Sequence, residues 1–168
     1  MAPSGDSPLR IEARAAAGAP VTDHVWLTFE DRTRSRLVAR LGSGVEATVL
    51  LPRGVVLRDG DRLQAADGRV VEVRAAPESL LDVAVAEPEL LARAAYHLGN
   101  RHVAVALRPG GLRVARDTVI ERLLRGLGLD PQPIDAPFEP EGGAYGPAHT
   151  HRGESGRLAP VIHEFRRP

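Results

Sequence analysis

The sequence contains no cysteine and no lysine among its 168 residues, and few aromatic residues. The absence of cysteine excludes disulfides, thiolate metal ligands, iron–sulfur clusters and a thiol nucleophile. A metal site in this chain would have to use histidine, carboxylate and backbone oxygen ligands. All 22 basic residues are arginine and they balance 22 acidic residues, so the formal net charge is zero. This balance argues against the broad basic surface of nucleic-acid-binding proteins.

The sequence also lacks long apolar runs and several familiar motifs. No stretch approaches the ~18 consecutive apolar residues of a membrane-spanning helix. The first residues lack the basic and apolar regions of a signal peptide. We therefore expect a cytoplasmic protein with no membrane association. No G-x-S-x-G, Walker A or G-x-G-x-x-G motif is present, which leaves hydrolases, NTPases and dinucleotide enzymes without support.

Short apolar segments separated by turn residues indicate β structure over residues 1–75. Val25, Leu27 and Phe29 alternate with polar residues, as expected for a half-buried strand. Glycine-rich and Asp-Gly turns at 42–44 and 67–68 are typical of hairpins. Strands recurring at about 8–12 residues predict a small all-β barrel or sandwich.

The pattern changes to alternating strands and helices over residues 76–138. A helix is expected from Pro88 to Gly99, and a second one after the capping residue Asp117. Strands are expected at 80–85, 102–107, 112–115 and 132–138. The resulting order, βαββαβ, is that of a ferredoxin-like domain. The sequence therefore predicts an α+β protein with an all-β N-terminal domain and a ferredoxin-like second domain.

Residues 139–168 show no hydrophobic periodicity and contain five glycines and four prolines. Such a composition predicts a flexible C-terminal tail. Glu139 and Glu141 stand among prolines at its start, which favours an extended surface connector, although the two carboxylates could also act as a pair. Arginines at 32, 34, 36 and 40 are expected to alternate along a strand edge. They would form either a solvated strand face or a basic surface for an acidic partner.

The histidines are the residues with the clearest chemical potential. His149 and His151 are two positions apart, so their imidazoles can lie on the same side of an extended chain. Both could approach one metal ion at about 2.0–2.1 Å, and imidazole suits nickel, copper and zinc. From spacing alone they could equally be two solvated side chains. His102 is expected at the start of a strand and His97 on the preceding helix, where a structural role is more common.

Residues 96–102 read Y-H-L-G-N-R-H. This heptapeptide closely resembles the signature of the UreE urease accessory proteins, a family of nickel metallochaperones. The similarity continues in L-P-R-G at residues 51–54, in L-R-D-G-D at residues 57–61, and in P-F-E-P-E-G-G-A-Y at residues 137–145. These matches occur in the same order and span most of the chain.

The resemblance implies a homodimer formed through the second domain, with His102 near the two-fold axis. One Ni²⁺ ion could then be shared by both protomers, because an isologous interface repeats each ligand. His149 and His151 match the tail region that supplies further imidazoles, and His163 is an additional candidate. The resemblance implies no catalysis: the ion, for which Zn²⁺ or Cu²⁺ could substitute, is carried to the urease accessory GTPase and the urease apoprotein assembly complex.

The sequence departs from some relatives of this family in its histidine content. Its tail offers three histidines in place of a long His tract, and residues 112–117 contain none. These differences favour delivery over storage of nickel, with the β domain facing the partner. Two alternatives are a small RNA- or ribosome-associated binding module without a metal role and a metal-dependent enzyme. Neutral charge and scarce aromatic residues disfavour the first.

Overall fold

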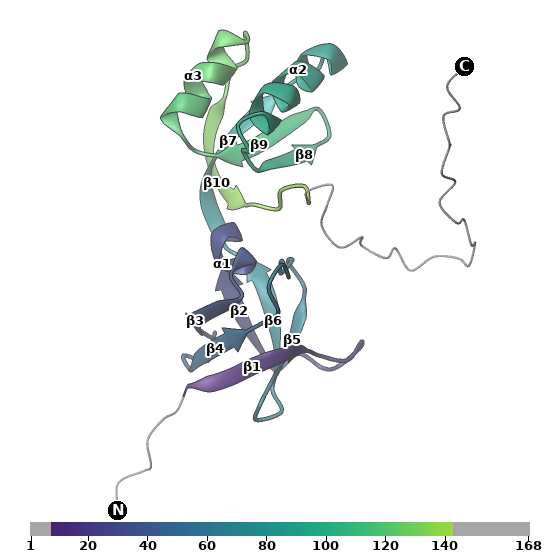
Figure 1. The fold of residues 1–168 in the computed structure, drawn as a ribbon, viewed down its shortest axis with the longest axis vertical. Helices are drawn as coiled ribbons and strands as arrows, with labels where there is room; N and C mark the ends of the chain where they lie inside the picture. The colour runs from purple at the N-terminus through teal and green to yellow at the C-terminus, as the bar shows by residue number, and fades with distance from the viewer. Residues whose placement is uncertain (1–7, 143–168) are drawn as a thin grey trace, which may run out of the picture.

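The computed structural model describes residues 8–142 and has a mixed α+β fold with two sheets (Figure 1). The first sheet has six strands in the order β2-β6-β5-β1-β4-β3. Their bounds are β1 (Leu9–Arg14), β2 (Asp23–Leu27), β3 (Arg36–Arg40), β4 (Glu46–Leu50), β5 (Arg62–Ala65) and β6 (Val70–Ala75). The β5–β6 and β3–β4 hairpins turn at the two glycine-containing sites that the sequence indicated.

Alternating apolar residues of these strands form the core of the first domain. Val25 and Leu27 of β2 are buried, whereas Trp26 between them is 54% exposed. They pack with buried residues of the other strands and with Leu57, which follows β4 in a loop. The period-two pattern of the sequence thus corresponds to one buried and one solvated face of a curled sheet.

The sheet curls because the β3–β4 hairpin returns to strand β2. The Gly42 amide donates to the His24 carbonyl at 2.8 Å. The Asp23 carboxylate, which is 6% exposed, accepts from the Ser43 hydroxyl at 2.6 Å and from the Ser43 and His24 amides. Burial alone would raise the pKa of Asp23, but these hydrogen bonds outweigh it and hold the pKa below its usual value.

A short helix interrupts the expected all-β pattern of the first domain. Helix α1 (Phe29–Thr33) begins at Phe29, which the alternation of the sequence assigned to a strand. Thr28 is the N-cap: its hydroxyl accepts from the Asp31 amide at 3.2 Å and donates to the Asp31 carboxylate at 2.9 Å. This local capping ends β2 at Leu27. The expectations of an all-β domain and of a strand through Phe29 were therefore wrong.

The arginines between residues 32 and 40 do not alternate along one strand edge, as the sequence suggested. Arg32 lies in α1 and is 0% exposed, and Arg34 is the C-cap of the same helix. Only Arg36 and Arg40 belong to β3, and both are exposed. The helix places Arg32 on the inner side of the domain, so this residue has a structural environment unlike that of the other three.

The second sheet has four antiparallel strands in the order β10-β7-β9-β8. Its elements follow each other along the chain as β7 (Pro77–Ala84), α2 (Pro88–Gly99), β8 (Val105–Arg108), β9 (Gly111–Ala115), α3 (Thr118–Gly126) and β10 (Gln132–Pro137). Both helices cover the same face of this sheet (Figure 1). Leu98 of α2 and Leu124 of α3 are fully buried there against Leu81, Val83 and Leu112 of the strands.

The predicted helix limits of this domain are confirmed. Helix α2 starts with Pro88 in its first turn, where the missing N–H has no consequence, and ends at Gly99. Asp117 caps α3 by accepting from the Val119 and Ile120 amides at 2.7 and 3.0 Å. Across residues 8–142, no helix is long and apolar enough to cross a membrane.

Asp23→Ala should lower the free energy of unfolding by about 1–3 kcal/mol, because the Ser43 and His24 donors lose a buried acceptor. Since folding lowers the pKa of Asp23, its contribution is present above the unfolded pKa of about 3.9. It is lost as pH falls through the lower folded pKa. Urea unfolding at pH 7 and pH 3 measures both effects. The exposed Asp130→Ala serves as the control, and an equal loss at both pH values would contradict the assignment.

Candidate functional site

His102 lies in the turn that follows α2, not at the start of a strand as the sequence suggested. Strand β8 begins three residues later, at Val105. The His102 amide donates to the Gly99 carbonyl at 2.9 Å, and the Val103 amide donates to the Leu98 carbonyl at 3.1 Å. This pair of bonds is a Schellman motif, which ends a helix by reversing the chain. The helix stop, not a strand, therefore determines where His102 sits.

The backbone of His102 adopts a left-handed conformation with φ of 55°. Within residues 8–142 it is the one residue other than glycine with a positive φ. The position that His102 occupies in a Schellman motif is usually glycine, because a Cβ there costs about 1–2 kcal/mol. Val103 follows and packs against the same core that buries Leu98, so the surrounding structure holds the strained residue in place.

The His102 side chain is exposed, as is Arg101 before it, whereas Val103 after it is partly buried. His97, one turn earlier on α2, is half-buried and lies edge-to-face against Tyr96 with ring centroids 5.5 Å apart. The Arg101 guanidinium donates to the His97 carbonyl at 2.9 Å, which satisfies a free carbonyl at the helix end. These contacts occupy Tyr96, His97 and Arg101 locally and leave the His102 imidazole facing solvent.

The other histidines that the sequence singled out are not brought to His102 within the part of the chain that the structure describes. His149, His151 and His163 lie outside the described residues. Among residues 8–142, no three histidines or carboxylates are grouped closely enough to hold a metal ion. His24 is in the first domain, edge-to-face against Trp26 at 4.1 Å between ring centroids.

Glu139, considered as a member of a carboxylate pair, is engaged in ion pairs with the first domain. It contacts Arg32 and lies 3.3 Å from Arg58. Phe138 is 2% exposed and packs edge-to-face on Phe29, with ring centroids 5.7 Å apart. Residues 138–140 are therefore built into the boundary between the two domains and are not a surface connector. Sequence reasoning missed this role of Arg32, because Phe138 and Glu139 lie more than a hundred residues away from it.

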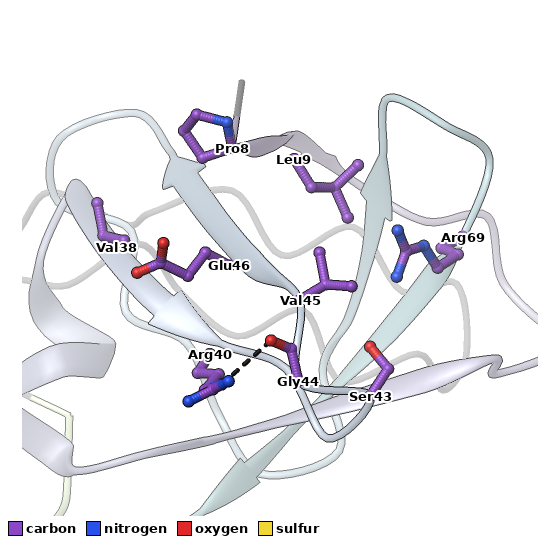
Figure 2. A pocket seen from close by; sticks show the side chains of 9 residues that line it. All are labelled: Pro8, Leu9, Val38, Arg40, Ser43, Gly44, Val45, Glu46 and Arg69. Atoms are coloured by element: carbon purple, nitrogen blue, oxygen red, sulfur yellow. Dashed lines mark hydrogen bonds between the residues drawn. The ribbon is translucent and has the colours of Figure 1, made fainter. Parts of the chain in front are cut away.

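A cavity of about 770 Å³ lies in the first domain, beside the β3–β4 hairpin (Figure 2). Arg40, Glu46 and Arg69 provide its charged lining, and Leu9 and Val45 are among its apolar residues. The Arg40 side chain donates to the Gly44 carbonyl at 3.1 Å. None of the predicted metal ligands lines this cavity, so it is separate from the site around His102.

Comparison with known proteins identifies the family to which this chain belongs. The model of the UreE urease accessory protein N-terminal domain matches residues 9–76, and that of the C-terminal domain matches residues 78–165. The chain belongs to the UreE urease accessory protein family. The family is one of accessory chaperones for urease maturation and not of enzymes.

Individual relatives match over 69–93% of their own lengths. The urease accessory protein UreE of Dechloromonas aromatica (strain RCB) is 47% identical over 161 residues, covering 86% of this chain and 92% of the relative. That of Nitrosospira multiformis is 44% identical over 164 residues, covering 93% of each. That of Burkholderia ambifaria is 47% identical and covers 85% of this chain and 69% of the relative. The family resemblance read from residues 96–102 is thus confirmed.

His102→Gly should raise the stability of the protein by up to about 1 kcal/mol, because glycine adopts the left-handed conformation without a Cβ penalty. Thermal unfolding of the metal-free protein measures the change. The matched control is His97→Gly on the last turn of α2, where glycine should lower stability by a few tenths to 1 kcal/mol. A loss of stability in His102→Gly would mean that the imidazole makes a structural contact that outweighs the strain.

Proposed function

We propose that this protein is a nickel metallochaperone that binds Ni²⁺ through histidines at a homodimer interface and delivers it to the urease maturation complex. The observation that carries the proposal is the conformation of His102. It occupies a strained position that glycine would fill at lower energy, on an exposed turn, at the end of the heptapeptide typical of the family. Backbone strain at an exposed polar residue is usual at functional sites, where the function of the side chain outweighs the energetic cost of the conformation.

The proposed site needs ligands beyond the one imidazole that each described chain presents. A two-fold axis next to the turn would pair His102 with His102 of the second protomer, so that one sequence position supplies two ligands. His149, His151 and His163 would complete the coordination. Imidazole ligands bind Ni²⁺ and do not exclude Zn²⁺ or Cu²⁺ on affinity alone. The ion is cargo and takes part in no reaction of this protein.

The chain length permits the tail to reach this turn. The Glu141 amide donates to the Val105 carbonyl at 2.8 Å, and Val105 is three residues after His102. Three residues span at most about 11 Å between Cα atoms, so Glu141 lies close to the His102 turn. His149 follows eight residues later, and eight residues can extend up to about 29 Å. His149 and His151 can therefore meet an ion held by His102.

The second domain, residues 76–138, is proposed to be ferredoxin-like. Its elements occur in the order βαββαβ, and its sheet places the fourth strand first, followed by the first, third and second. This combination supports the ferredoxin-like arrangement, with both helices on one face. The accompanying domain limits, residues 1–75 for the β-rich domain and 139–168 for the tail, belong to the same proposal.

The proposed partners are the urease accessory GTPase and the urease apoprotein assembly complex, in the cytoplasm. The first domain would face these partners, since its exposed side chains include Trp26, Arg36 and Arg40. Hydrophobic and arginine side chains are common at protein–protein interfaces. The zero net charge fits recognition of proteins better than binding of nucleic acid.

His102→Ala should abolish the shared site while the dimer stays folded, because the side chain is exposed and makes no core contact. Calorimetric titration with Ni²⁺ should give one high-affinity ion per dimer for the native protein and none for the variant. His97→Ala, on the preceding helix turn, is the control and should retain binding. Unchanged nickel binding by His102→Ala, or one ion per monomer in the native protein, would overturn the shared-axis site.

Deletion of residues 145–168 should weaken nickel binding without changing the oligomeric state. The tail is proposed to donate ligands and to take no part in the subunit interface. Light scattering gives the mass of the truncated protein, and titration gives its affinity. A protein with the three tail histidines replaced by alanine is the full-length control and should match the truncation in affinity. A monomeric truncation would contradict this division of roles.

A further inference from the structure

Strand β3 forms one edge of the first sheet, and part of its backbone points away from that sheet. Among residues 8–142 it pairs with β4 on one side and with no strand on the other (Figure 1). Just after β3, the Leu41 amide donates to the Val45 carbonyl at 2.8 Å. Hydrogen-bonded pairs alternate along an antiparallel ladder, so every second residue before Leu41 also faces β4. The N–H and C=O groups of Arg36, Val38 and Arg40 therefore point outward.

The other strand edges of the two sheets are blocked or covered in ways that β3 is not. Strand β10 contains two prolines, which cannot donate to an added strand. On β8, the Val105 carbonyl accepts from the Glu141 amide at 2.8 Å. On β2, the His24 carbonyl accepts from the Gly42 amide at 2.8 Å. Strand β3 has no proline, and no backbone group of residues 8–142 covers its outward side.

The side chains on the outer face of β3 have a simple pattern of charge. Arg36 and Arg40 are exposed, and Val38 between them is 62% exposed. Leu37 faces the opposite way and is buried in the core of the first domain. The core therefore holds β3 in place beneath these three side chains. The open edge presents a fixed row of cation, apolar side chain and cation.

The charge of this edge is not neutralised within the part of the chain that the structure describes. The two arginines of β3 form no ion pair with a carboxylate of residues 8–142, unlike Arg34, which pairs with Glu30. On β4, the residues directly opposite positions 36, 38 and 40 are Leu50, Thr48 and Glu46, in that order. Glu46 offsets part of the charge at position 40, and nothing acidic on β4 opposes position 36. An acidic side chain would complement the remaining positive charge.

We propose that the open edge of β3 binds an extended acidic segment of a partner protein as an added strand. Its backbone would continue the ladder at Arg36, Val38 and Arg40, a recurring mode of peptide recognition. Opposite side chains of adjacent strands lie about 4.5–5.5 Å apart, so the segment needs acidic residues opposite the two arginines and an apolar residue opposite Val38. The inference rests on the proposed function in one respect, that the partner belongs to the urease maturation complex. It involves none of the proposed metal ligands.

A second copy of this chain is a poorer occupant of the same edge. Antiparallel pairing of two β3 strands centred on Val38 would place Arg36 opposite Arg40 of the other copy. Parallel pairing in register would place each arginine beside the same arginine. Like charges directly opposite each other destabilise a sheet, and charged residues on an edge strand protect against self-association. The arginines therefore favour an acidic strand over another copy of β3.

The cavity of the first domain adjoins this edge. Val38 and Arg40 contribute to its lining, together with Leu9 and Val45 (Figure 2). A strand added to β3 would cover Val38 and the side of the cavity that Val38 and Arg40 form. Pockets beside an added strand give this mode of binding its sequence specificity, while the backbone hydrogen bonds give its affinity. The cavity therefore favours an apolar residue at the centre of the bound segment.

A synthetic peptide tests the proposal in the full-length protein. The probe is T-E-T-V-T-E-T, acetylated and amidated at its ends, and binding is followed by NMR of the backbone amides. The amides of Arg36, Val38 and Arg40 should shift most, with a Kd of about 0.1–1 mM that rises with added salt. The matched peptide T-K-T-V-T-K-T should bind at least about tenfold more weakly. If about 2 mM of the acidic peptide shifts no β3 amide, the proposal is wrong.

Variants of β3 separate binding at this edge from binding elsewhere. The double variant Arg36→Glu/Arg40→Glu should lose the acidic peptide and bind the lysine peptide instead. The double variant Arg116→Glu/Arg122→Glu makes the same charge change at exposed positions of the second domain and should bind like the native protein. Acidic-peptide binding that survives the change in β3, or that is lost equally in both double variants, would overturn the proposal.

The backbone contribution has its own variant. Val38→Pro removes an outward amide and keeps the bonds to β4, so it should weaken binding of the acidic peptide at least about tenfold. Full affinity in Val38→Pro would show that no strand is added at this edge. Should Val38→Pro fail to fold, as judged by its thermal unfolding, the two double variants decide the question.

Self-association and failure of the proposed function give different results. If light scattering shows assemblies larger than a dimer that Arg36→Glu/Arg40→Glu alters, β3 pairs with a second copy and the proposal is overturned. Nickel titration of the same variant should match the native protein, because the edge holds no proposed ligand. Peptide binding without His102-dependent nickel binding would contradict the metal role alone. Nickel binding at His102 without peptide binding would contradict the edge proposal alone.

Discussion

The buried guanidinium of Arg32 is the constraint on which the relation between the two domains depends. An unpaired buried charge costs several kcal/mol, and removing one partner of a buried pair typically costs about 3–5 kcal/mol. Its acceptors come from the loop after β4 and from the chain after β10. Helix α1 must therefore form, the loop must close and β10 must be in place before its two terminal nitrogens have their acceptors, while its Nε has no hydrogen-bond partner among residues 8–142. The two sheets can each bury their own core, but Arg32 requires them to be assembled together.

Helix α1 is also where the sequence was most misleading, and the reason is local. Val25, Leu27 and Phe29 follow the period of a strand, yet the Thr28 side chain caps a helix that starts at Phe29. Helix capping competes with strand pairing over one or two residues. Hydrophobic periodicity contains no information about this competition. Elsewhere the pattern was sufficient: the run of β-branched residues at 70–73 and the spacing of residues 90–98 correspond to strand β6 and helix α2.

The candidate site was only partly predictable for a second reason. The heptapeptide at residues 96–102 identified His102, but nothing in the local sequence revealed its left-handed backbone, since Gly99 offered a sufficient helix stop. The conformation follows from the pair of bonds that Gly99 and Leu98 accept, which a pattern of residue types does not specify. The contact of Arg32 with Glu139 spans 107 positions, beyond the reach of any periodicity argument. Both features depend on tertiary structure, which is where function usually departs from local preference.

A carrier must bind its ion tightly enough to retain it and loosely enough to transfer it. The proposed arrangement divides these two demands between two kinds of ligand. His102 lies on a turn that the core under α2 holds in place, so in the proposed dimer its two copies would have a fixed separation. In the proposed function the tail histidines would add affinity because they are tethered to the same chain, which requires no rigid cage of ligands. A partner that competes for the tail ligands would lower the affinity without unfolding either domain. Because Glu139 is bound to the first domain through Arg32 and Arg58, the path of the chain directly after β10 depends on the packing between the domains.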